Sequence, residues 1–341
     1  MTLQVFDGHN DVVLRLGEGR SFTEESSEGH LDLPRAQRGG FAGGLFAIFV
    51  IGERSRPPEG KPTIPYSLPL APPVVPAAAR ATAEQLAGVL FALEDEGALA
   101  IVRSAAGIEE CFAAGHIAAV LHLEGAEPLA AVGELAAWHE RGLRSLGLVW
   151  SRANRYAEGV PFRFPASPDT GPGLTAAGRE LVAECNRLGV LVDLSHLNLR
   201  GFFDVAELSS APLVASHSNA HALCPATRNL TDEQLDAVAA SGGLVGVNFA
   251  VTFLREDGRF EPDTPLDGVV RHIDYLVERM GIDHVGLGSD FEGAAPPEAL
   301  RDVTCLPALF EALATRGYDD EGLEKIAHRN WLRVLRETWG G

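Results

Sequence analysis

The 341-residue chain has few cysteines, little positive charge and no long hydrophobic run, and each scarcity excludes a class of protein. Its four cysteines include no Cys-x-x-Cys pair, which argues against a zinc knuckle or a disulfide framework. Only 28 basic residues stand against 47 acidic ones, and a net charge of −19 disfavours nucleic-acid binding because such a surface repels phosphates. No segment resembles a membrane span, and the N-terminal MTLQVFDGHND lacks the basic and apolar regions of a signal peptide. We therefore expect a cytoplasmic protein that binds neither nucleic acid nor membrane.

Short apolar runs with β-branched residues recur along the chain, and each ends in polar or small residues. They cover 3–6, 41–51, 117–123, 143–150, 189–196, 212–217, 243–250 and 284–291. Segments with helical periodicity lie between most of them, and the clearest cover 81–97, 174–189, 231–242 and 266–281. Several begin with Thr or Asp and end in Gly, and Thr231-x-x-Gln234 has the form of a capping box. Eight buried strands that alternate with helices predict an α/β fold, a (β/α)₈ TIM barrel.

A doubly wound open sheet is the rival architecture, but no GxGxxG turn follows the first strand. We find no internal repeat or flexible linker and expect residues 1–341 to form a single catalytic domain, with 322–339 as an amphipathic closing helix. Two segments depart from the alternating pattern. The proline-rich stretch at about 52–76 is expected to be an ordered surface excursion. The long loop at about 159–173 follows the fourth strand, on the side where barrel enzymes keep their active sites.

Ionisable residues stand at the C-terminal ends of five predicted strands. These residues are His9, Asp11, Glu124, His196, His217 and Asp290. Because strand ends of one kind meet at one mouth of a barrel, we expect the six side chains to lie close together. Three imidazoles and three carboxylates can hold two divalent cations, with one carboxylate bridging the pair. A lone histidine at a strand end is more often a hydrogen-bonded structural residue, but that explanation does not account for six residues at the same end.

Three further residues have open roles at this stage. Arg228 lies on an irregular segment after the sixth strand, where it is either a surface arginine or a group that binds a substrate carboxylate through two hydrogen bonds. Asp7 shares a strand face with His9 and either orients a ligand or caps the turn. His122 points the same way as Glu124, and the sequence does not decide whether it reaches the site.

The motifs that carry these residues resemble those of a known family. In chain order they are DGHND (7–11), HLEGAEPL (122–129), DLSHLN (193–198), SHSNA (216–220), TRN (227–229) and GLGSDFEG (286–293). They are similar to the motifs of the membrane (renal) dipeptidase family, within the amidohydrolase superfamily, and NWLRVL at 330–335 resembles the family's closing segment. Many amidohydrolases carry His-x-His on the first strand, whereas His9-Asn10-Asp11 is the dipeptidase form. The chain looks like a soluble bacterial-type member.

The resemblance implies a barrel of the metallo-dependent hydrolase type with two Zn²⁺ ions per chain. One ion would be held by His9, Asp11 and Glu124, and the other by Glu124, His196 and His217. It further implies that a water bridging the ions attacks the peptide bond of a dipeptide and that Asp290 is the acid/base. Arg228 matches the family arginine that binds the substrate's C-terminal carboxylate. Family members are generally homodimers and accept a D-residue at the C-terminal position, so L-X–D-Y dipeptides are among the expected substrates.

One departure from the family pattern concerns substrate contacts. Mammalian members carry a histidine in a Leu-Thr-His motif after the fourth strand, whereas this chain has Trp150 within LVWSRANRY. An indole donates one N–H but cannot become an imidazolium, so we expect Trp150 to contact the substrate differently rather than to abolish activity. A related zinc amidohydrolase acting on N-acyl amino acids or small amides and lactams is an alternative. An inactive barrel used as a binding scaffold is another, which the complete ligand set disfavours.

Overall fold

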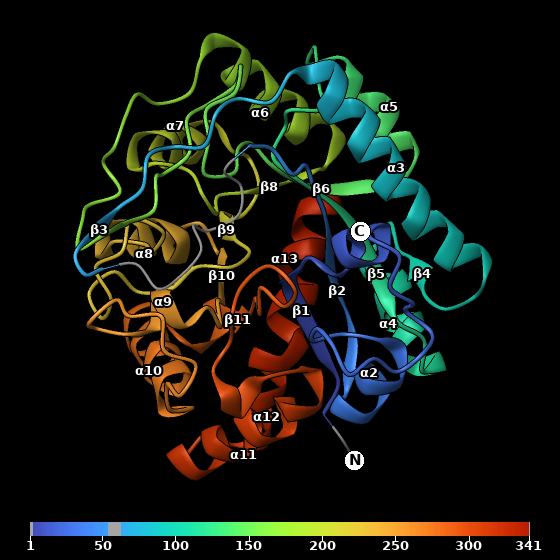
Figure 1. Cartoon of the computed structure of the whole chain (residues 1–341), viewed down its shortest axis with the longest axis vertical. Coiled ribbons are helices and arrows are strands. Elements are labelled where there is room, and N and C mark those ends of the chain that lie inside the picture. The colour runs from blue at the N-terminus through green and yellow to red at the C-terminus, as the bar shows by residue number, and fades with distance from the viewer. Residues whose placement is uncertain (1–2, 54–62, 341) are drawn as a thin grey trace.

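The computed structural model of the protein describes residues 3–53 and 63–340, and eight strands in these ranges pair in a closed ring (Figure 1). The ring runs β1–β2–β5–β6–β8–β9–β10–β11 and back to β1, and all its pairings are parallel. The strands are β1 (Val5–Asn10), β2 (Phe41–Phe49), β5 (Ala118–Glu124), β6 (Leu143–Gly147), β8 (Leu191–Asp193), β9 (Val214–Ala215), β10 (Leu244–Val247) and β11 (Val285–Leu287). A short ninth strand, β4 (Ala100–Ile101), pairs with β5 outside the ring. The predicted (β/α)₈ barrel is confirmed.

Several strands end earlier than their apolar runs predicted. The run at 284–291 contains β11, which stops at Leu287, and the run at 189–196 contains β8, which stops at Asp193. In both places the last residues of the run lie in a turn, in which His196 and Asp290 adopt left-handed backbone conformations with φ of 69° and 60°. The polar ends of these runs therefore belong to the loops at the mouth of the barrel.

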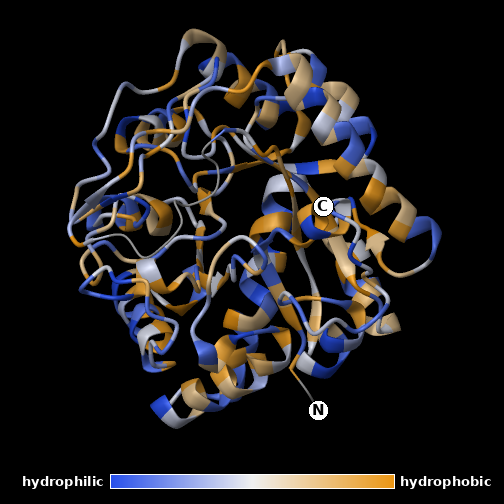
Figure 2. Ribbon diagram, viewed as in Figure 1, coloured by the Kyte–Doolittle hydropathy of each residue, from blue (hydrophilic) through white to orange (hydrophobic). Residues whose placement is uncertain are grey.

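Helices cover the outside of the barrel. They are α1 (Val12–Gly17), α2 (Leu33–Gly39), α3 (Pro76–Asp95), α4 (Ala105–Ala114), α5 (Glu134–Glu140), α6 (Ala176–Leu188), α7 (Leu199–Leu208), α8 (Asp232–Ala240), α9 (Val251–Leu254), α10 (Asp267–Met280) and α11 (Leu306–Arg316). The predicted capping box is present in α8, where the Thr231 side chain accepts from the Gln234 backbone and the Gln234 side chain accepts from the Thr231 backbone. Hydrophilic and hydrophobic residues alternate along the outer helices (Figure 2), as expected when one helix face packs on the strands. No helix within the described ranges combines the length and the apolar character that crossing a membrane requires.

The C-terminal segment covers the N-terminal end of the barrel. It is not the single predicted helix but α12 (Asp320–Glu324), a π-helical turn at Lys325–Arg329 and α13 (Asn330–Trp339). Trp331 on α13 is fully buried against Phe6, with ring centroids 5.9 Å apart, and its indole N–H donates to the Leu287 carbonyl at 2.9 Å. The approach is so close that a Cβ on Gly8 would lie 2.3 Å from the Trp331 ring. Figure 1 shows α13 crossing the centre of the ring, which leaves the opposite end of the barrel for the site.

The two predicted irregular segments lie together at the mouth. Residues 54–62 of the proline-rich excursion fall outside the described residues, but Tyr66–Ser67 form β3, which pairs antiparallel with β7 (Arg163–Phe164) in the 159–173 loop. The Leu68 N–H also donates to the Phe162 carbonyl at 2.8 Å. The ladder ties the excursion to the loop on one side of the mouth.

Candidate metal centre and active site

The six ionisable residues singled out in the sequence meet at the mouth of the barrel. His9 and Asp11 come from the end of β1, Glu124 ends β5, and His196, His217 and Asp290 follow β8, β9 and β11. The five expected metal ligands are at most 6% exposed, and Asp290 is partly exposed. Parallel strands bring these side chains together across long stretches of sequence because all their C-terminal ends face one mouth.

The two oxygens of Glu124 face different partners. Glu124 Oε1 lies 3.1 Å from His196 Nε2 and 3.7 Å from His217 Nε2. Glu124 Oε2 lies 3.8 Å from His9 Nε2, and His9 Nε2 is 3.4 Å from Asp11 Oδ2. A carboxylate placed in this way can bridge two cations, each completed by a separate group of ligands.

The buried carboxylates of the cluster favour a positive charge beside them. Burial alone would lower the pKa of His9, but the charges of Glu124, Asp11 and Asp290 outweigh it and raise this pKa to about 10. Burial raises the pKa of Glu124 well above its usual range, partly offset by His9. Burial lowers the pKa of His196 and of His217 well below the usual range, so both imidazoles are neutral near pH 7. Neutral imidazoles and carboxylates are the forms that bind metal ions.

Divalent cations fit this set of side chains. Both ring nitrogens of His9 and Oδ1 of Asp11 are buried without a hydrogen-bond partner among the described residues, which is costly unless another group satisfies them. Sets of atoms within 4.8 Å of one another come from His9, Glu124 and His217 and from His9, Asp11 and Asp290. Imidazole and carboxylate together are a donor set suited to Zn²⁺.

Asp290, a member of the second of these sets, is held in place by two hydrogen bonds. Its Oδ2 accepts a hydrogen bond from the Asn248 side chain at 2.9 Å, and its backbone N–H donates to the His9 carbonyl at 3.0 Å. Loss of hydration raises the pKa of Asp290 to about 6; His9 and the Asn248 hydrogen bond oppose this shift, and Asp11 adds to it. A Cβ on Gly293 would lie 2.1 Å from Asp11 Oδ2 and 2.5 Å from Asp290 Oδ1, so a glycine is needed where these two carboxylates approach each other.

Arg228 is buried at the mouth rather than on the surface. It is 3% exposed, and its Nη2 donates to the His217 carbonyl at 3.0 Å. Its Nε has no hydrogen-bond partner within 3–53 and 63–340, and its guanidinium lies 5.5 Å from the centre of the Phe253 ring. Burial lowers the pKa of Arg228, while Asp290 and Glu124 oppose this shift. The guanidinium thus lies close to the candidate metal centre with an unused donor.

Trp150 lies beside the cluster, with its ring 5.7 Å from that of His196. Phe162 of the 159–173 loop follows, 5.6 Å from Trp150 and stacked at 6.2 Å on Phe253. An apolar wall of Trp150, Phe162 and Phe253 therefore connects a metal-ligand candidate to Arg228. Phe162 was not predicted, because a single phenylalanine in a long loop carries no sequence signal of its position.

The sequence left the roles of Asp7 and His122 open, and the structure places the two side chains differently. Asp7 accepts hydrogen bonds from the N–H and the hydroxyl of Ser289, both at 2.7 Å, so it holds the turn that carries Asp290. His122 lies beneath His9, with ring centroids 5.5 Å apart, and its Nδ1 is 2.9 Å from Ser145 Oγ. Asn248 was not predicted, although it follows β10 at the same end of the barrel. A search of the strand ends for neutral polar residues, and not only for ionisable ones, would have found it.

Comparisons with known proteins agree with this arrangement. A family model for membrane dipeptidase (Peptidase family M19) matches residues 1–339. A metallo peptidase from Rhodobacter sphaeroides, solved with a phosphinate mimic of the dipeptide L-Ala-D-Ala, is 48% identical, with a TM-score of 0.94 over 99% of this chain and 100% of that chain. The dipeptidase AC, a metallo peptidase of family M19, is 49% identical, with a TM-score of 0.94 over 100% of both chains. The dipeptidase aclJ of Aspergillus oryzae is 31% identical over 346 residues, which cover 97% of this chain and 77% of that protein. The chain therefore belongs to the membrane dipeptidase family, peptidase family M19, and is a metallopeptidase of the dipeptidase type.

Proposed function

We propose that the protein is a binuclear zinc dipeptidase whose substrates include L-X–D-Y dipeptides. The observation that carries this proposal is the orientation of the Glu124 carboxylate: its Oε1 faces His196 and His217, and its Oε2 faces His9. His9, Asp11 and Glu124 would hold one ion, and Glu124, His196 and His217 the other. A bound pair of cations supplies charge that lowers the pKa of a water molecule and polarises the peptide carbonyl.

Asp290 is the acid/base in this proposal. Its carboxylate accepts the proton of the attacking water and returns that proton to the amine of the departing residue. The hydrogen bond from Asn248 to Asp290 Oδ2 orients the carboxylate and favours its charged form.

Arg228 and the apolar wall select the substrate. The buried guanidinium binds the C-terminal carboxylate through charge-assisted hydrogen bonds, which requires a free carboxylate close to the scissile bond. Trp150 and Phe162 contact the substrate between its peptide bond and its carboxylate. The phosphinate mimic of L-Ala-D-Ala bound to the Rhodobacter relative supports a dipeptide with a D-residue at its C-terminal end.

An N-acyl amino acid is a second substrate class to test, because it carries the same carboxylate for Arg228. The remaining predictions are a single catalytic domain over residues 1–341, a homodimer and a cytoplasmic location. Light scattering of the purified protein tests the homodimer, because it measures the mass of the assembly against the 36.3 kDa chain.

A dipeptide library that includes L-X–D-Y members tests the proposal directly. The zinc-loaded protein and the Asp290→Asn variant are assayed side by side, together with N-acyl amino acids, and bound zinc is counted for both. We expect hydrolysis of dipeptides by the parent, two zinc ions per chain in both proteins, and little turnover by the variant. Less than one zinc per chain and no hydrolysis would instead favour the binding scaffold.

A further inference from the structure

Asp193 is a buried carboxylate at the end of β8, behind the candidate ligand histidines. It is 1% exposed. Its Oδ1 accepts hydrogen bonds from the backbone N–H groups of Ser195 at 3.0 Å and Ser216 at 2.8 Å. Its Oδ2 accepts the hydroxyl proton of Ser216 at 2.5 Å, a distance typical of a charge-assisted hydrogen bond. The position of Asp193 is therefore fixed, and so is the direction in which the Ser216 hydroxyl points.

The same hydroxyl group contacts His217. Ser216 Oγ lies 2.7 Å from His217 Nδ1. A serine hydroxyl has one proton, and because Ser216 donates it to Asp193, its oxygen can only accept at His217. His217 Nδ1 therefore carries the imidazole proton, and Nε2 keeps a free lone pair. That lone pair lies on the side of the ring that faces the metal centre, where Nε2 is 3.1 Å from His196 Nε2 and 3.7 Å from Glu124 Oε1.

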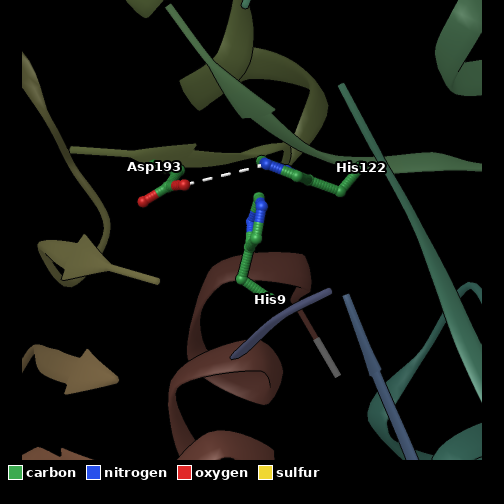
Figure 3. A group of neighbouring side chains, drawn as sticks. All are labelled: His9, His122 and Asp193. Atoms are coloured by element: carbon green, nitrogen blue, oxygen red, sulfur yellow. Dashed lines mark ion pairs between the residues drawn. The ribbon is translucent and has the colours of Figure 1, made fainter. Parts of the chain in front are cut away.

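The other two ligand histidines are held differently in the described ranges. His196 Nδ1 lies 2.9 Å from Ser151 Oγ, and the structure gives this hydroxyl no carboxylate partner. His9 Nδ1 has no hydrogen-bond partner in the part of the chain that the structure describes. His9 lies near Asp193 and His122 (Figure 3), and the nearest approach of His122 to the carboxylate is 3.7 Å, between Nε2 and Oδ2. This distance is longer than a hydrogen bond, and burial lowers the pKa of His122 to about 4, so the imidazole is neutral near pH 7. The hydrogen-bonded path from Asp193 to a ligand therefore runs through Ser216.

We propose that Asp193 is a positioning residue for the metal centre: through the Ser216 hydroxyl it keeps His217 in the tautomer whose Nε2 binds a metal ion. The inference rests on the proposed binuclear centre but assigns Asp193 no contact with metal or substrate. Groups that orient the ligands of a metal commonly change its affinity by about 10- to 100-fold when they are mutated.

The variant Asp193→Asn should reverse the direction of the hydrogen bonds from residue 193 through Ser216 to His217, rather than merely remove them. The asparagine amide places an N–H₂ group against Ser216 Oγ, so the hydroxyl must turn its proton toward His217 Nδ1. His217 then carries its own proton on Nε2, where no lone pair remains for a metal ion. The tautomer of a catalytic triad histidine is lost in the same way when its aspartate becomes asparagine. In contrast, Ser216→Ala leaves His217 free to adopt either tautomer, and its effect must be smaller.

The experiment compares zinc affinity in Asp193→Asn, Ser216→Ala and the double variant, starting from metal-free protein and using a competing chromophoric chelator. We expect the zinc site that includes His217 to lose about 10- to 100-fold in affinity in Asp193→Asn and less than about tenfold in Ser216→Ala. The double variant should return to the level of Ser216→Ala, because the hydroxyl that imposes the wrong tautomer is gone. Cobalt(II) absorption adds a spectroscopic readout, since the bands of one of the two bound ions should change in Asp193→Asn.

Asp7→Asn is the matched control. Asp7 is also buried and accepts from the N–H and the hydroxyl of one serine, Ser289, at 2.7 Å each. The Ser289 hydroxyl has the His9 carbonyl as a further acceptor at 3.2 Å, and the structure places no imidazole nitrogen on it. Asp7→Asn should therefore reduce the thermal stability of the metal-free protein, as Asp193→Asn should, but keep the parental affinity of both zinc sites.

Two results overturn the inference: parental zinc affinity in Asp193→Asn, or a double variant that binds zinc as weakly as Asp193→Asn alone. If Asp193→Asn does not fold, Ser216→Ala tests the inference instead. We then expect a loss of about three- to tenfold in zinc affinity, and an unchanged zinc affinity would overturn the inference. Zinc binding that follows the expected order in a protein without dipeptidase activity would refute the proposed function and leave this inference standing.

Discussion

The Nε2 atoms of His196 and His217 lie 3.1 Å apart, and both face Glu124 Oε1. Two neutral imidazoles with lone pairs at this distance repel each other unless a proton or a cation lies between them. We therefore predict that His217→Ala lowers the zinc content from two ions to one per chain and abolishes dipeptide hydrolysis. Elemental analysis after dialysis, paired with an activity assay, checks this.

The exposed His116 offers the control for this prediction. His116→Ala should keep two zinc ions and full activity. Chelation of the parent should remove both ions and the activity, and added zinc should restore them. A His217→Ala protein that still holds two tightly bound ions would show that the ligand set is assigned wrongly.

The second prediction concerns turnover without metal loss. Asp290→Asn preserves the size of the side chain and tolerates the left-handed backbone at this position, where φ is 60°. We expect the variant to bind zinc as the parent does but to lose about 10²- to 10⁴-fold in kcat, the usual contribution of a general acid/base. Steady-state kinetics on one dipeptide compares kcat of the parent and the variant, and the zinc content is measured in the same samples. Parental kcat in the zinc-loaded variant would remove Asp290 from the mechanism.

The third prediction is a pH shift caused by Asn248. Its N–H donates to the ionised form of Asp290 and so lowers the pKa of this carboxyl, opposing the burial that raises it to about 6. Removing the donor in Asn248→Ala raises the pKa, and since Asp290 must be ionised to act as a base, activity should fall at a higher pH on the acidic side. Bound cations lower the pKa in parent and variant alike, so the difference between them keeps its sign. The pH dependence of kcat measures it, and an acidic limb that is unmoved or displaced to lower pH contradicts the assignment.

The fourth prediction concerns the recognition of the substrate carboxylate. Arg228→Lys keeps the positive charge but loses the planar pair of donors, so KM for dipeptides should rise about 10- to 100-fold, the cost of one or two hydrogen bonds to a charged group. Dipeptide amides serve as the matched substrates, because they lack the carboxylate. The parent should prefer free dipeptides to their amides, and Arg228→Lys should lose most of this preference. If the preference survives, another group binds the carboxylate.

The fifth prediction tests the packing at the closed end of the barrel. A Cβ at position 8 would lie 2.3 Å from the Trp331 ring and 2.5 Å from the Ser216 carbonyl oxygen, so Gly8→Ala must displace both a buried ring and the backbone. We expect a loss of about 2 kcal/mol or more in the free energy of unfolding, measured by chemical denaturation. Gly88→Ala in the middle of α3 is the control, because a Cβ there meets nothing within 4 Å and alanine favours a helix by up to about 1 kcal/mol over glycine. Equal stability of the two variants would contradict the observed packing.

Much of the barrel could be predicted because its signals are local. Apart from His122, a run such as 117–123 is apolar on both faces, as a strand enclosed by other strands and helices must be, and its length and ending place Glu124 at the mouth. Six ionisable residues at such endings therefore indicated a shared site before any distance was known.

Other features depend on partners that the sequence does not connect. The path from Asp193 to His217 requires the backbone N–H and the hydroxyl of Ser216 to meet a carboxylate from the preceding strand. The position of Phe162 depends on the pairing of β7 with β3, two short strands in segments that lack alternating hydrophobicity. The π-helical turn at Lys325–Arg329 interrupts a continuous amphipathic pattern, and its five residues include no glycine or proline that would predict the interruption.

The pairing of β3 with β7 has a consequence for the way substrates enter. Tyr66 is paired with Phe164, Leu68 donates to the carbonyl of Phe162, and Ala71 donates to that of Ser151 at 3.2 Å, next to Trp150. Swinging the 159–173 loop outward on its own would break the Tyr66–Phe164 pairing and the bond from Leu68, and it would separate the stacked Tyr66 and Phe164 rings, which lie 5.9 Å apart. Opening this side of the mouth therefore requires the loop either to break these contacts or to carry residues 66–68 of the excursion with it.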